Sequence, residues 1–230
     1  MRHPMYTEHA NAYAKAVQDN IYNAHLERPS LLSLLNITPG ERVLDLGCGS
    51  GEHAKAIQGM GGIVTCIDQS KEMISIAREN AQPFKAYVQD VAIGLPAESS
   101  AQYDWVIAPL MIHYIKDFRL LFNEIRRVLN TNGHFVFSTH HPINDFSVSP
   151  SGNYFATEQI VETWDTVGEP VTVRFYRRSL QALFSAVHEA GFTVSVFSEG
   201  RVSSKVSELD RETYLNLTTK PSFIYMHCIL

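Results

Sequence analysis

The chain has 230 residues, 45% of them hydrophobic, which is enough for one sizeable domain and few for two domains with separate cores. Its formal charge of −5 and the lack of a basic run predict a field that repels polyanions, so nucleic acid is not an expected partner. No apolar run approaches the roughly 18 to 20 residues of a membrane span, and residues 1–13 do not resemble a signal peptide, so we expect a cytoplasmic protein without a membrane partner.

The first elements of the chain are predicted to be helical. Apolar residues recur every three or four positions over residues 7–27, as on one face of an amphipathic helix. Pro29 is expected to interrupt this helix, a second short helix follows over residues 31–35, and a turn ends at Gly40. Residues 1–40 therefore read as a helical cover.

Short apolar runs then alternate with helix-like segments. They span residues 42–46, 63–67, 84–88, 105–110 and 134–138. Strand-like runs separated by helices are typical of a parallel sheet that is covered on both faces. Two later runs, 192–197 and 223–230, flank a polar stretch and could form a terminal antiparallel pair.

The segment between these groups has a different pattern. Apolar and polar side chains alternate over residues 171–176, as in a half-exposed strand. A turn at Gly168-Glu169-Pro170 would join this strand to an earlier one near residues 160–164. We therefore predict a β-hairpin insertion over the sheet edge.

The most informative stretch is a buried strand that runs directly into Gly47, Gly49 and Gly51. Glycines let the backbone turn sharply and let a ligand approach closely, although a purely structural turn is the alternative. Dinucleotide sites follow the pattern Gly-x-Gly-x-x-Gly, and the position of the last glycine is Glu52 here. Because a carboxylate at a helix start opposes a pyrophosphate, the loop favours S-adenosylmethionine over NAD.

Two acidic residues end the next two strands. Asp68 lies about twenty residues after the glycines, where a carboxylate can accept both hydrogens of a ribose diol. Asp90 is placed to accept from the exocyclic amine of adenine. The alternative for either residue is a cap on the helix that follows it.

With these residues, the chain resembles the class I S-adenosylmethionine-dependent methyltransferases, particularly their small-molecule branch. Residues 43–51 are similar to the family's first motif, residues 103–114 to its fourth strand and following loop, and residues 124–135 to the next helix, turn and fifth strand. The resemblance implies a Rossmann-like seven-stranded α/β sheet in the order 3-2-1-4-5-7-6, with strand 7 antiparallel and helices on both faces. Residues 130–133 depart from the family's usual proline-containing turn.

The resemblance also implies a set of cofactor-binding residues. Asp45 and the glycine loop would lie near the methionine part, Asp68 on the ribose, and Asp90 with Val91 on the adenine. Two tyrosines are hypotheses that rest only on their place in the covering helix. The full set is Tyr13, Tyr22, Asp45, Gly47, Cys48, Gly49, Ser50, Gly51, Asp68, Gln69, Met73, Asp90, Val91, Ala108, Pro109, Leu110 and His113.

Methyl transfer is an in-line displacement, so the protein mainly aligns the reacting groups and excludes water. A base helps if the acceptor is a hydroxyl or an amine, and His113, which follows the fourth strand, is the catalytic candidate. His140 and His141 are alternatives that could instead bond the loop backbone. No third ligand accompanies these imidazoles, so we expect no metal site.

We therefore predict a single methyltransferase domain over residues 1–230, acting on an unidentified small-molecule acceptor as a monomer or homodimer. Its parts are the cover (1–40), the cofactor-binding core (41–141), a β insertion or lid (142–178), and a C-terminal helix with strands 6 and 7 (179–230). Aromatic residues of the cover and insertion, among them Tyr6, Tyr154, Phe155, Trp164 and Phe175, would either wall the acceptor pocket or serve as ordinary packing on the sheet or a dimer contact. An NAD-dependent oxidoreductase and a non-catalytic S-adenosylmethionine-binding module remain the alternatives.

Overall fold

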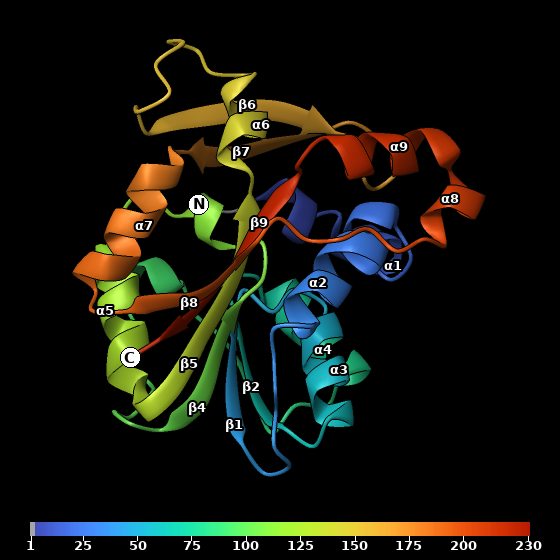
Figure 1. Ribbon diagram of the computed structural model, residues 1–230. Coiled ribbons are helices and arrows are strands. Elements are labelled where there is room, and N and C mark those ends of the chain that lie inside the picture. The colour runs from blue at the N-terminus through green and yellow to red at the C-terminus, as the bar shows by residue number, and fades with distance from the viewer. Residues whose placement is uncertain (1–2) are drawn as a thin grey trace.

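A central sheet with helices on both sides organises the computed structural model, which describes residues 3–230 (Figure 1). The strands of this sheet, in spatial order, are β3 (Lys85–Val88), β2 (Ile63–Asp68), β1 (Arg42–Leu46), β4 (Tyr103–Ala108), β5 (Leu129–His140), β9 (Phe223–Ile229) and β8 (Thr193–Ser198). Neighbours from β3 to β5 pair in parallel, whereas β9 runs antiparallel to β5 and β8. The predicted order is confirmed, because β8 and β9 are the sixth and seventh strands of this sheet along the chain.

The two faces of the sheet carry separate helical layers. Helices α3 (Glu52–Gly59) and α4 (Lys71–Asn80) pack on one face, and α5 (Arg119–Val128) and α7 (Leu180–Glu189) on the other (Figure 1). The period of two in β1 sorts its side chains between these layers. Leu44 packs in a cluster with Phe122 of α5, and Val43 packs in a second cluster with Ile57 of α3.

The N-terminal cover is broken into more pieces than predicted. It consists of η1 (Pro4–Tyr6), α1 (Ala10–Ala16), the π-helical turn η2 (Asn23–Glu27) and α2 (Arg28–Leu32). The predicted continuous helix over residues 7–27 is therefore wrong. Side chains bond the backbone groups that lack helical partners at the break. The Asn20 side chain accepts from the backbone N–H of Asn23 at 2.7 Å, and Arg28 donates to the Val17 carbonyl at 2.6 Å.

The predicted interruption at Pro29 is also wrong, since η2 continues directly into α2. Proline is tolerated in the first turn of a helix, where its missing N–H costs least. The carbonyl of His25, four residues before Pro29, instead accepts a hydrogen bond from the backbone N–H of Ser203 at 3.0 Å. A segment far away in sequence thus supplies the donor that proline lacks.

Strand β5 begins earlier than predicted and includes the expected turn at residues 130–133. Its register with β4 shifts between Tyr103 and Trp105, which marks an irregular start. The Asn130 side chain donates to Asp104 at 2.5 Å across this irregularity. A side-chain bond therefore stabilises the region where backbone pairing changes register.

The predicted hairpin insertion is confirmed as a two-stranded antiparallel sheet of β6 (Glu158–Trp164) and β7 (Val171–Arg177). Figure 1 shows it across the end of the large sheet at which β5 finishes. Buried Val173 packs with Met5 of η1, and the Phe175 ring packs edge-on against His140 with centroids 4.7 Å apart. The hairpin therefore covers the end of the sheet at which β5 finishes.

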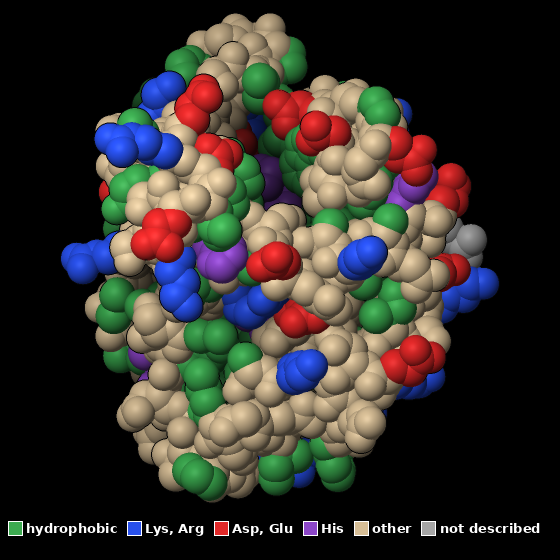
Figure 2. Space-filling view, turned by 90° about the vertical axis from the view of Figure 1, so that its right-hand side faces the viewer, with side chains coloured by type: hydrophobic (Ala, Val, Ile, Leu, Met, Phe, Trp, Pro, Cys, Tyr) green, Lys and Arg blue, Asp and Glu red, His purple; other side chains and the backbone are tan. Residues whose placement is uncertain are grey.

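The remaining helices are short, apart from α9. They are the 3-10 turns η3 (Val91–Ile93) and η4 (Ile112–Tyr114), and the α-helices α6 (Pro142–Phe146), α8 (Val206–Leu209) and α9 (Arg211–Thr219). On the face drawn in Figure 2, neither acidic nor basic side chains form one continuous patch, and the upper part is hollowed. Within residues 3–230 no helix is long and apolar enough to cross a membrane. The three cysteines are free and buried.

Candidate functional site

A cavity of about 300 Å³ lies at the carboxyl ends of β1, β2, β3 and β4. Its walls are the loops that follow these strands, the N-terminal cover and the hairpin. In sheets of this order the strand order reverses between the parallel strands β1 and β4, and ligands bind in the crevice outside that switch point. The cavity therefore occupies the position expected for a cofactor.

Most of the predicted site residues meet at this cavity. Those in its wall are Tyr13, Gly47, Cys48, Gly49, Ser50, Asp68, Gln69, Asp90, Val91, Pro109 and Leu110. The others do not reach the wall: they are Tyr22, Asp45, Gly51, Met73, Ala108 and His113. Tyr22 directly precedes η2 and is 44% exposed, whereas the remaining five sit in or against the packed core.

The three glycines of the loop serve different purposes. All three have positive φ, at +69° for Gly47, +52° for Gly49 and +83° for Gly51. A Cβ on Gly47 would lie 2.7 Å from the Cβ of Met111, and one on Gly51 would lie 3.1 Å from the Cβ of Ala81. A Cβ on Gly49 would meet nothing within 4 Å, although Gly49 lies in the cavity wall. The outer glycines permit packing, and the middle one leaves room for a ligand.

Asp68 ties the glycine loop to the end of β2. Its carboxylate accepts from the backbone N–H of Gly49 at 3.0 Å and from that of Ser70 at 2.8 Å. Burial raises the Asp68 pKa, against the opposing effect of these backbone bonds. The hydroxyl of Ser70 accepts from the Met73 N–H and caps α4, so Asp68, which lines the cavity, is not the cap of this helix.

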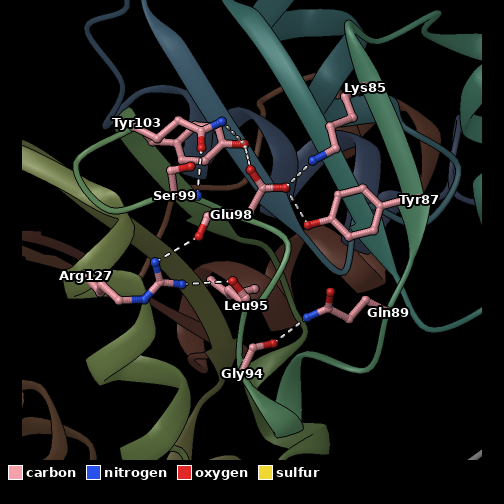
Figure 3. A network of polar contacts seen from close by, with 10 residues as sticks. Lys85, Tyr87, Gln89, Gly94, Leu95, Glu98, Ser99, Tyr103 and Arg127 are labelled. Carbon is pink, nitrogen blue, oxygen red and sulfur yellow. Dashed lines mark hydrogen bonds and ion pairs between the residues drawn. The ribbon is translucent and has the colours of Figure 1, made fainter.

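A network of polar contacts around Glu98 supports the part of the cavity wall that follows β3 (Figure 3). The buried carboxylate of Glu98 accepts from Lys85 at 2.7 Å and from the hydroxyls of Tyr87 and Tyr103, both at 2.6 Å. Burial acts to raise the Glu98 pKa, but these bonds together outweigh it, so the pKa is lowered. Gln89, which lines the cavity, donates to the carbonyl of Gly94 at 2.5 Å. The network fixes the segment after β3 that includes Asp90 and Val91.

An acidic cluster lies beside the glycine loop, and sequence reasoning named Asp45 in it but missed Glu27 and its neighbour His53. Glu27 is 1% exposed; its carboxylate accepts from Ser138 at 2.7 Å and lies 3.1 Å from Nε2 of His53. Both oxygens of the fully buried Asp45 lack a hydrogen-bond partner within residues 3–230. Burial raises the pKa of Asp45 to about 7, with His53 opposing and Asp68 and Glu27 reinforcing the shift. Burial lowers the His53 pKa, but the carboxylates of Glu27 and Asp45 outweigh it, so the pKa is raised.

Three tyrosines form the wall opposite the loop. The hydroxyls of Tyr6 and Tyr114 are 2.6 Å apart, and the rings of Tyr6 and Tyr13 meet edge-on with centroids 4.9 Å apart. Burial raises the pKa of all three phenols. The carbonyl of Tyr6 accepts from the hydroxyl of Ser70 at 2.6 Å, which fastens this wall to the end of β2.

The catalytic candidate His113 lies behind this wall. It is 2% exposed, stacks on His140 with centroids 4.1 Å apart, and its Nδ1 lies 3.3 Å from the hydroxyl of Thr139. Burial lowers its pKa well below the usual range. It packs on Tyr114, with ring centroids 4.3 Å apart, so it supports the cavity without reaching its surface.

The cavity includes further residues that the sequence did not single out as ligand-binding. They are His3, Val17, Asn23, Glu27, Arg28, Glu52, His53, Gln89, Ala92, Met111, Tyr114, Ile115, Gln159, Arg174 and Tyr176. Tyr6 of the expected acceptor wall lines the cavity, but Tyr154, Phe155, Trp164 and Phe175 do not. The outward positions of β7, Arg174 and Tyr176, contribute instead. The alternation of apolar and polar residues over 171–176 could have indicated them, because its polar positions face away from the buried side of β7.

Residues 44–137 match the family described as "Methyltransferase domain". The chain is 33% identical to a malonyl-[acyl-carrier protein] O-methyltransferase of Erwinia pyrifoliae over 133 residues, which are 56% of this chain and 50% of that protein. It is 32% identical to a ubiquinone biosynthesis O-methyltransferase of Proteus mirabilis over 104 residues, 44% of this chain and 42% of that protein. These matches span half or less of the relatives' length.

The fold is similar to solved structures over nearly its whole length. A putative S-adenosylmethionine-dependent methyltransferase from Listeria monocytogenes matches with a TM-score of 0.73 and 22% identity, over 95% of this chain and 98% of that one. At this identity the likeness concerns the fold.

Proposed function

Because residues 44–137 match a methyltransferase domain, we propose that the chain belongs to the class I, S-adenosylmethionine-dependent family and transfers the methyl group of S-adenosylmethionine to a small molecule. The family match covers the loops after β1 to β4 but not the N-terminal cover or the hairpin. The acceptor therefore has to be inferred from this chain's own residues.

The observation that carries the proposal is the space above Gly49, next to the carboxylate of Asp68. A Cβ at Gly49 would meet no atom within 4 Å, and Asp68 accepts hydrogen bonds from the turn after β1, at Gly49, and from the turn after β2, at Ser70. Glu52, at the start of α3, adds a carboxylate to the wall where a pyrophosphate would otherwise approach the helix end. This arrangement suits an adenosyl ligand that has no phosphate.

The charges of the site also fit this cofactor. S-adenosylmethionine carries a sulfonium and an ammonium but one carboxylate, and Glu27, Asp68 and Asp90 line the cavity. Asp45, buried without a hydrogen-bond partner, would be compensated by a cation nearby. Arg28 lines the same cavity, and its positive charge suits the cofactor's carboxylate.

When bound, the cofactor supplies a methyl group that is already activated on positive sulfur. The residues of this chain then have to hold it in line with the acceptor and exclude water. We assign Asp68 to the ribose, Asp90 and Val91 to the adenine, and the tyrosine wall to the face opposite the loop. His113 acts as a positioning residue behind Tyr114.

Calorimetric titration with S-adenosylhomocysteine, S-adenosylmethionine and NAD tests this proposal. We expect saturable binding of the first two, none of NAD, and at least about a tenfold loss of affinity in Asp68→Ala. Binding of NAD alone would instead favour an oxidoreductase. Release of S-adenosylhomocysteine with an acceptor mixture separates an enzyme from a binding module.

The remaining assignments are proposals of the same kind. We propose one domain over residues 1–230, a cytoplasmic location and a monomer or homodimer. Three free buried cysteines are compatible with a reducing compartment. Light scattering of the purified protein would determine the oligomeric state.

A further inference from the structure

Every hairpin side chain that lines the cavity carries a hydrogen-bond donor. Its lining residues are Gln159, Arg174 and Tyr176. Arg174 and Tyr176 are two apart on β7 and so share one face of the strand, and Gln159 pairs with Tyr176 in the ladder. The Tyr176 hydroxyl accepts from the Gln159 amide at 3.2 Å, which leaves its own proton free to donate.

Arg174 differs from the other charged residues of the wall. Glu27 pairs with His53, Glu52 with Asn80, and Arg28 with a carbonyl, and Asp68 and Asp90 accept from backbone N–H groups. The guanidinium of Arg174 makes no hydrogen bond or ion pair to any residue that the structure describes, 3 through 230. It is a cation at the cavity whose five donors are unused.

The backbone of Arg174 is nevertheless held in place. Nε2 of His3 lies 2.8 Å from its carbonyl oxygen and 3.1 Å from its nitrogen. His3 is 5% exposed and packs edge-on against Tyr114, with ring centroids 5.1 Å apart. The N-terminal segment thus fixes the strand position from which this cation extends.

A series of contacts relates Arg174 to the proposed cofactor site. Ser70, beside Asp68, bonds the carbonyl of Tyr6; Tyr6 bonds Tyr114; and Tyr114 packs on His3, which holds Arg174. The tyrosine wall therefore lies between the ribose end of the site and the hairpin. A molecule that presents its nucleophile at this wall would extend its other end toward Arg174 and Tyr176.

We propose that Arg174 and Tyr176 form an anion subsite, and that the methyl acceptor is a small organic acid whose oxyanion they bind. A guanidinium with a neighbouring phenol donor suits two oxygens of a carboxylate or a phosphate ester, and no acidic side chain of the hairpin lines the cavity among the described residues. This inference rests on the proposed methyltransferase function and adds the substrate class.

The experiment uses the whole protein saturated with S-adenosylhomocysteine and titrated with benzoate, phenyl phosphate and benzamide. Benzamide has the shape of benzoate without its charge. We expect at least one anion to bind about tenfold more tightly than benzamide, and added salt to reduce this preference. The more tightly bound anion identifies the group as a carboxylate or a phosphate ester.

Two variants complete the test. Arg174→Gln should remove the preference for the anion while leaving the affinity for S-adenosylhomocysteine and the thermal midpoint unchanged. Arg211→Gln, at an exposed residue of α9 outside the cavity, should retain it.

Equal affinity for the anions and benzamide, no binding of either anion, or a preference that survives in Arg174→Gln would overturn the inference. If S-adenosylhomocysteine itself does not bind, the proposed function fails first. If it binds and the anion preference is absent, only the subsite is wrong.

Discussion

Gly49 offers the sharpest test at the scale of a single residue. Its φ of +52° and the open space at its Cβ position predict that Gly49→Ala weakens S-adenosylhomocysteine binding by about tenfold or more, because the methyl group occupies the ligand's place. Gly40→Ala is the matched control, since Gly40 also has positive φ and an open Cβ position but lies outside the cavity. Equal affinities in the two variants, measured by calorimetry, would contradict this role of Gly49.

Asp45 gives a second residue-scale prediction, on pH. Its folded pKa of about 7 lies above the unfolded value, so the folded state holds the extra proton and the contribution of Asp45 to stability falls as pH rises from about 4 through 7. The thermal midpoint of Asp45→Asn minus that of the parent protein should therefore increase by about 5 °C from pH 5 to pH 8, without ligand. If scanning calorimetry gives the same difference in thermal midpoint at every pH in this range, ionising the buried Asp45 carboxylate does not destabilise the fold.

At the scale of elements, the network around Glu98 joins β3, β4 and the segment between them. Glu98→Gln should lower the free energy of unfolding by about 2 kcal/mol at pH 7, because a buried charged acceptor is lost from three donors. The Glu98 pKa is lowered, so its contribution is present above the unfolded pKa and is lost as pH falls through the folded value. Urea unfolding at pH 7 and pH 4 should then show a smaller difference at the lower pH. Gln159→Ala, on the hairpin, is the control.

The elements also show which patterns the sequence specifies. Strands β1, β2 and β9 are buried runs between turns, and their type and place were predictable. The N-terminal helix was mispredicted because its regular apolar spacing continues through a break that side chains stabilise from a distance. Neither the Arg28 bond to Val17 nor the Ser203 bond to His25 has a local signature.

For the whole molecule, a ligand that binds only the folded state should raise the thermal midpoint. S-adenosylhomocysteine at about one hundred times its dissociation constant should add about 2.7 kcal/mol, a shift of about 5 to 10 °C for a chain of this size. NAD at the same concentration should leave the midpoint unchanged. A midpoint insensitive to S-adenosylhomocysteine would remove the basis of the proposed function.

The sequence predicted the residues of the site only where they belong to a motif with a recognisable spacing. The glycine loop, Asp68 and Asp90 follow strand ends at recognisable spacings, so their meeting at the cavity was expected. Glu27 and Arg174 reach the same cavity from segments far apart in the chain, and no spacing connects them. His113 was expected at the ligand because it follows β4, but the 3-10 turn η4 directs it into the core.

The separate hairpin has a consequence for how specificity can change. Within residues 3–230, β6 and β7 pair only with each other and form no ladder with the seven-stranded sheet. Insertions or exchanges along their outward face would therefore leave the register of the large sheet intact. A graft of this ribbon from another enzyme of the same architecture could alter the choice of acceptor while the adenosyl pocket is inherited unchanged.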